Sequence, residues 1–111
     1  MRRRTVLALT VLTGIVFTLS APGAIDFHRH WRIAQAERMF NRKDYAQARS
    51  EFKDLADSAV DPVEQAMLAA RAAIALGYQE GQYERALEEV ARIKYQPVAD
   101  YALVTLLAFA R

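Results

Sequence analysis

The chain of 111 residues contains no cysteine, and this absence excludes several kinds of site and support. Without cysteine there are no disulfides, no thiolate metal ligands and no acylated lipoprotein amino terminus. Glycine and proline are also few, with four and three residues, and no glycine-rich phosphate loop is present. A small domain of this kind depends on side-chain packing for its stability.

A basic surface is lacking as well, although the whole chain has a formal net charge of +2. Arg2, Arg3 and Arg4 precede an apolar run, and from Ile25 onward the chain has 12 Lys or Arg and 13 Asp or Glu. Neutralising phosphates requires clustered cations on the folded part. We therefore expect no nucleic acid among the partners.

Residues 1–25 have the outline of an export segment: a positive start, an apolar run over 5–19 and small residues at 20–24. Counted as far as Ile25, the run is also about long enough to span a bilayer as an uncleaved anchor. A signal peptide and a membrane anchor both stay open. In either case the arginines remain inside, so the rest is expected in the cell envelope, periplasmic or anchored to the inner membrane.

The rest of the chain, 26–111, repeats itself: the segment 44–52 recurs 38 residues later as 82–90. Each copy places an aromatic, a small and a large apolar residue on one face of a helix. A turn and another apolar-periodic segment precede each copy, so the unit is two helices joined by a short turn. The matching residues are Tyr45, Ala48 and Phe52, and Tyr83, Ala86 and Val90.

The pattern predicts an all-α fold of about five helices after the apolar segment. Asp26 is the expected cap of the first helix, and Asp61, Pro62 and Glu64 have the spacing of a capped helix start. Gly81 supplies a left-handed turn position. The expected ranges are 26–41, 44–58, 61–78, 82–94 and 98–110, grouped as units 26–60 and 61–96 followed by a terminal helix within 97–110.

The repeated unit resembles the tetratricopeptide repeat (TPR), a helical hairpin that stacks into a right-handed superhelix. The residues that carry the resemblance are Ala36, Asp44, Tyr45, Ala48, Phe52, Pro62, Gly81, Tyr83, Ala86, Val90 and Pro97. The period of 38 is longer than that of the family, Lys43 replaces its turn glycine, and Gly77 replaces a bulky aromatic. The resemblance implies a non-enzymatic scaffold whose groove receives a peptide or a helix of a protein partner.

A shorter likeness runs from Gln96 to Leu103, which is similar to segments in the helical region of soluble lytic transglycosylases. It implies an alternative function, the non-catalytic helical arm or a fragment of a peptidoglycan-processing enzyme. The catalytic domain of that family has no counterpart here. Under either hypothesis we expect no catalytic residues.

The groove positions carried over from the family fall on the first helix of each unit. The predicted partner-binding residues there are His30, Glu37, Asn41, Arg71 and Tyr78, and Ile33, Leu68 and Ala75 are further groove positions. Arginine and tyrosine anchor protein interfaces more often than other residues do, so Arg71 and Tyr78 carry most of the expectation.

The terminal helix 98–110 is apolar around its whole circumference, a pattern typical of a helix that is buried on every side. Nothing in the sequence after it would cover its far side. We therefore expect dimerisation or docking through Tyr101, Leu106 and Phe109.

No reactive centre is expected. His28 and His30, two residues apart, do not share a helical face and so do not form a metal site with Asp26. Arg85 and Glu89 are expected to pair on the outside of their helix. No cofactor and no metal is expected. The carboxylates weighed as acid/base groups and assigned instead to solvated helix faces are Asp54, Asp57, Glu88 and Glu89.

Overall fold

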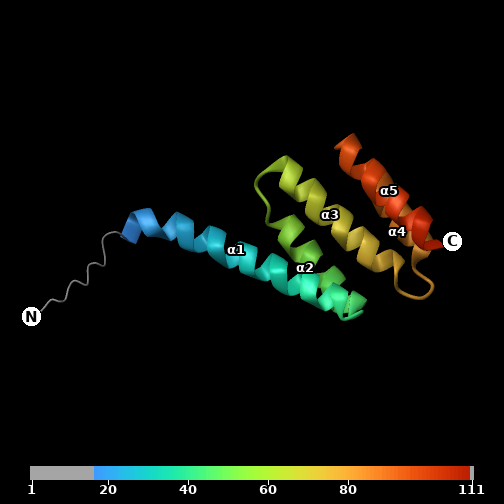
Figure 1. Cartoon of the computed structure of the whole chain (residues 1–111). Helices are drawn as coiled ribbons and strands as arrows, with labels where there is room; N and C mark the ends of the chain where they lie inside the picture. The colour runs from blue at the N-terminus through green and yellow to red at the C-terminus, as the bar shows by residue number, and fades with distance from the viewer. Residues whose placement is uncertain (1–16, 111) are drawn as a thin grey trace, which may run out of the picture. The chain divides into compact units, whose positions relative to one another are not determined.

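The computed structural model describes the backbone of residues 17–110 and the side chains of residues 27–110, and all regular structure in this part is helical (Figure 1). The contacts divide the chain after Trp31, within the first helix, into units 1–31 and 32–111. The helices are α1 Phe17–Asn41, α2 Tyr45–Asp57, α3 Pro62–Gly77, α4 Tyr83–Ala91 and α5 Gln96–Ala110.

Four of these helices lie within a few residues of their expected ranges, but α1 begins at Phe17 and not at Asp26. The expectation that Asp26 caps the first helix is therefore wrong. An N-cap residue serves the free N–H groups at a helix start, whereas Asp26 has further helix on its N-terminal side. The predicted export or anchor segment, 1–25, lies outside the residues whose side chains the structure describes.

The start of α3 agrees with its predicted cap. The backbone N–H of Glu64 donates a hydrogen bond to the Asp61 carboxylate at 2.9 Å, and Pro62 occupies the first helical position. Proline is favoured there because its missing N–H would have had no partner inside the helix.

The helix α3 is the centre of the second unit, because its two sides belong to two different core clusters. One side packs Leu68, Ala72 and Ala75 among buried residues of α1 and α2. The other side packs Ile74 and Leu76 among buried residues of α4 and α5. Figure 1 shows the same order, with α3 between α2 and the pair α4 and α5. Alanines on α3 leave its neighbours close to its backbone.

The pattern of equivalent core positions follows the 38-residue repeat. Ala48 and Ala86 are both fully buried, and Phe52 and Val90 are buried one helical turn further along. Similar side chains therefore fill similar places in α2 and α4.

The helix α5 is attached by one side, not buried all around. Ala99, Ala102 and Leu106 are buried, whereas Tyr101, Leu103, Val104, Leu107 and Phe109 are exposed. The expectation that Leu106 lies on an exposed docking surface is wrong, because its side chain is fully buried. A Cβ atom added to Gly77 would clash with Leu106 Cδ2, so this glycine leaves the space that Leu106 fills.

Candidate functional site: a hollow between three helices

A hollow of about 400 Å³ lies along the last turns of α1, the second half of α3 and the middle of α5. Each of these helices contributes polar and apolar side chains to it, and α2 contributes one aromatic ring from beneath. The lining residues are Glu37, Phe40, Asn41, Phe52, Arg71, Ile74, Tyr78, Tyr101 and Thr105.

One ion pair joins the two charged residues of the hollow. Arg71 Nη1 lies 2.5 Å from Glu37 Oε2, and both side chains are close to half exposed. The guanidinium also lies 5.9 Å from the centre of the Phe52 ring, within the range of a cation–π contact. Its other nitrogens make no hydrogen bond to the described residues, so Arg71 keeps donors for a ligand.

Four aromatic rings pack together beside the hollow, and two of them, Phe40 and Tyr78, line it. Phe40, Tyr45 and Tyr78 lie 5.1 to 5.3 Å apart, centre to centre, with edge-to-face and tilted geometries. Phe109 stacks on Tyr78 at 4.1 Å. Aromatic rings at these distances attract one another, and Phe40 and Tyr78 present an aromatic wall beside the polar groups of the hollow.

The predicted partner-binding residues fall into three groups. Glu37, Asn41, Arg71, Tyr78 and Tyr101 line the hollow, and Phe109 stands at its edge through the contact with Tyr78. Leu106 belongs to the core. His30 is exposed in the first unit, 1–31.

Two further groove positions were also predicted wrongly. Leu68 and Ala75 are buried, at 4% and 0% exposure, because they face the core cluster shared with α1 and α2. Ile33 is partly buried and packs against the same cluster.

Sequence reasoning missed four residues of the hollow: Phe40, Phe52 as a lining ring, Ile74 and Thr105. A signal for Phe40 was present. Phe40 and Tyr78 are 38 residues apart, the spacing that relates Tyr45 to Tyr83. The sequence contains no comparable signal for Thr105, because its position depends on which side of α5 packs against the core.

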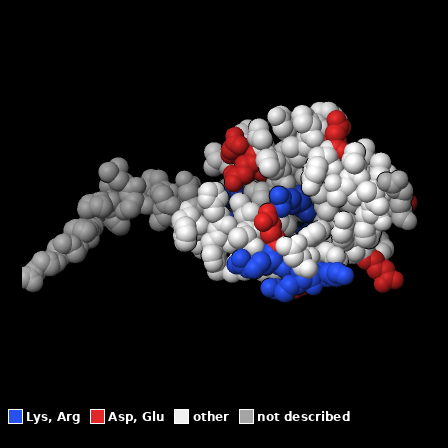
Figure 2. Space-filling model, in the orientation of Figure 1, with Lys and Arg blue, Asp and Glu red and all other residues white. Residues whose placement is uncertain are grey.

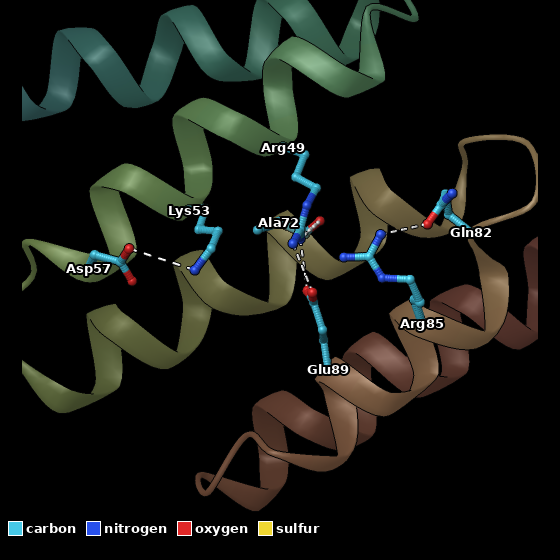
Figure 3. Close-up of polar contacts among 7 residues, drawn as sticks. All are labelled: Arg49, Lys53, Asp57, Ala72, Gln82, Arg85 and Glu89. Atoms are coloured by element: carbon cyan, nitrogen blue, oxygen red, sulfur yellow. Dashed lines mark hydrogen bonds and ion pairs between the residues drawn. The ribbon is translucent and has the colours of Figure 1, made fainter.

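The opposite side of the unit, formed by α2 and α4, is held by a second ion pair (Figure 3). The guanidinium of Arg49 donates to both carboxylate oxygens of Glu89, at 2.7 and 2.8 Å, and also to the Ala72 carbonyl at 3.4 Å. Its side chain is only 15% exposed. The donors of Arg49 are therefore engaged within the fold, in contrast to those of Arg71.

The expected pair of Arg85 with Glu89 is wrong. Glu89 reaches across to α2, and Arg85 donates instead to the side-chain oxygen of Gln82 at 2.8 Å (Figure 3). The contact with Arg49 is stronger because it is bidentate and better shielded from water.

The remaining titratable residues weighed as site candidates lie at the surface. Asp54, Asp57 and Glu88 are exposed, as are His28 and His30. In the part of the chain that the structure describes, no group of three or more His, Cys, Asp or Glu side chains is placed to hold a metal ion.

No protein-family model matches the chain, and neither the curated proteins nor the solved structures compared with it gave a match. Among the described helices, none combines the length and the hydropathy needed to cross a bilayer.

Proposed function

We propose that this protein is a non-enzymatic interaction module that binds a segment of another protein in the hollow between α1, α3 and α5. The single observation behind the proposal is the composition of that hollow. The three helices are the first, third and fifth along the chain, and their side chains converge on one concavity. Helical-repeat proteins build their extended binding surfaces in this way.

The proposal includes a TPR-like arrangement, with α1 and α2 as the first unit, α3 and α4 as the second, and α5 as the start of a third. The repeat supports it. Residues 38 apart have the same burial in α2 and α4, and both turns that precede these helices contain a left-handed residue, Lys43 and Gly81. In such an arrangement the first helices line the inner surface, as α1, α3 and α5 line the hollow.

The chemistry of the hollow favours a partner segment that combines an apolar side chain with polar groups. The aromatic wall of Phe40 and Tyr78 offers the apolar contact. Arg71 offers spare donors, and Glu37 offers a carboxylate already oriented by the ion pair. Tyrosine and arginine in a partly shielded cleft are the residue types that contribute most to protein binding.

We further propose that residues 1–25 direct the module out of the cytoplasm, so that its partner is a protein of the cell envelope. The support is the order of charged, apolar and small residues in that segment.

Site-specific photocrosslinking in intact cells tests the binding surface. A photoreactive amino acid at Asn41 in the full chain is expected to give a discrete adduct with another protein. The same amino acid at Lys53, exposed on α2, is the matched control and is expected to give none. The substitution Arg71→Glu should abolish the Asn41 adduct, and Arg85→Glu, on the α2 and α4 side, should leave it.

Equal adducts from Asn41 and Lys53, or an adduct unaffected by Arg71→Glu, would contradict the proposed groove. Release of muropeptides from cell walls by the purified chain would contradict its non-enzymatic character.

A further inference from the structure

The side of α5 that faces away from the core carries a patch of exposed apolar residues, which we call the α5 outer face: Tyr101, Leu103, Val104 and Leu107. Their exposed fractions are 63, 40, 65 and 52%. No charged residue occurs between positions 101 and 110. In Figure 2, the region where Figure 1 places α5 is mostly white, in agreement with this sequence.

This patch is a different surface from the hollow. The hollow takes Tyr101 and Thr105 from one flank of α5, whereas Val104 and Leu107 do not line it. The residues that attach α5 to the core are Ala99, Ala102 and Leu106, on the opposite side of the helix. Tyr101 belongs to both surfaces, whereas the other three residues of the outer face do not line the hollow.

We propose that the α5 outer face binds the same face of a second copy of this chain, with the two α5 helices antiparallel. A two-fold dimer uses one patch on both partners, so the patch must be complementary to itself. A surface without charge meets this condition, because the copies bring no like charges together.

The exposed carboxylate of Asp100, at the start of the uncharged run, favours one orientation of the two helices. A parallel pair would place the two copies of Asp100 at the same level along the axis, whereas an antiparallel pair separates them. The dipoles of two antiparallel helices also attract each other.

The size of the patch is sufficient for a weak dimer. The four side chains and the exposed alanines beside them offer roughly 500 Å², within the range in which a surface patch usually marks an interaction site. Two such patches would bury at most about 1,000 Å², the lower limit for a specific interface. Micromolar association, and not an obligate dimer, is the expectation from this area.

The absence of cysteine from the sequence makes disulfide crosslinking a clean test. Under mild oxidation, the full chain with Val104→Cys should form a covalent dimer at least tenfold more efficiently than the chain with Lys53→Cys. Asp100→Cys is the control for orientation. In an antiparallel pair two copies of position 100 lie more than a turn apart along the axis and should not crosslink.

Crosslinking of Asp100→Cys as efficient as that of Val104→Cys would overturn the antiparallel arrangement. Val104→Cys that crosslinks no better than Lys53→Cys, or that forms adducts with other proteins and none with itself, would overturn the proposal.

Sedimentation velocity gives a second readout that does not depend on cysteine. The double substitution Val104→Glu with Leu107→Glu should weaken dimerisation of the full chain in mild detergent by at least tenfold and leave its helical circular dichroism unchanged. Val60→Glu, at a position 95% exposed and distant from α5 in the sequence, should leave dimerisation as it was. Two results would overturn the proposal. One is a wild-type chain that stays monomeric at a concentration about 100 times a micromolar dissociation constant. The other is a double variant that dimerises like the wild type.

Discussion

Lys43 and Gly81 lie 38 residues apart and are the two residues with a positive φ in the part of the chain that the structure describes, at 68° and 78°. Lys43 closes α1 with two hydrogen bonds, from its own N–H to Phe40 O and from Asp44 N–H to Met39 O, both 2.9 Å. This is the pattern of a Schellman motif. Gly81 belongs to a tighter turn, which the bond from Gln82 N–H to Gln79 O closes.

The first prediction concerns the strained member of this pair. A residue other than glycine in the left-handed region costs about 1–2 kcal/mol of strain. Glycine removes this strain, but it also gives the unfolded chain more conformational freedom, which reduces the gain in stability by about 0.5–1 kcal/mol. Lys43→Gly is therefore expected to raise the free energy of unfolding by about 0.5–1 kcal/mol. Urea unfolding followed by circular dichroism measures the change.

The matched control is Gly81→Ala, which should lower the free energy of unfolding by about 1 kcal/mol. An added Cβ meets no atom within 4 Å there, so backbone strain alone would be measured. Stability unchanged in both variants would argue against these turn conformations.

The second prediction separates the two leucines at the middle of α5. Leu106 is fully buried beside Gly77, and Leu107 is 52% exposed. Leu106→Ala should lower the free energy of unfolding by about 2–4 kcal/mol because it leaves a cavity. Leu107→Ala should change it by no more than about 0.5 kcal/mol. Equal effects in thermal or urea unfolding would show that α5 is rotated from the position described.

These two leucines also show what the sequence pattern could not predict, namely which side of α5 packs against the core. Periodicity placed the helices correctly in α2 and α4, because a polar face and an apolar face determine which side packs inward. In α5 nearly every residue is apolar, so no periodic signal distinguishes Leu106 from Leu107. The distinction comes from the tertiary contact with Gly77, which local sequence does not encode.

The candidate site was predictable to a similar degree. The family resemblance pointed to Arg71 and Tyr78, and both line the hollow. It could not exclude Leu68 and Ala75, because the side of α3 that faces the core depends on how closely α1 and α2 approach. Nor could it find the bond between Arg49 and Glu89, whose partners are 40 residues apart.

The third prediction compares the two ion pairs that join separate helices. Arg49 and Glu89 are 15% and 24% exposed, and their contact is bidentate. A double-mutant cycle with Arg49→Met and Glu89→Gln should give a coupling energy of about 1–2 kcal/mol, as expected for a shielded hydrogen bond between charged groups.

The pair of Arg71 with Glu37 is the exposed counterpart, at 45% and 43%. Its cycle, with Arg71→Met and Glu37→Gln, should give no more than about 0.5 kcal/mol, because water screens the charges. A small coupling energy would mean that Arg71 can leave Glu37 and bind a ligand with little loss in the free energy of unfolding. A coupling energy for Arg71 and Glu37 as large as that of the other pair would instead make Arg71 a structural residue.

The fourth prediction tests two aspartates that precede helices in equivalent places but act differently. The Asp61 carboxylate accepts a hydrogen bond from Glu64 N–H, whereas Asp44 makes no side-chain cap bond at the start of α2. Asp61→Ala should therefore lower the free energy of unfolding by about 1 kcal/mol, and Asp44→Ala by no more than a few tenths. Because α3 contributes to both core clusters, fraying of its first turn should also increase amide hydrogen exchange in α2, beside the start of α3. Protection factors in the two variants check this: an equal loss in both would mean that side-chain capping does not distinguish the two helix starts.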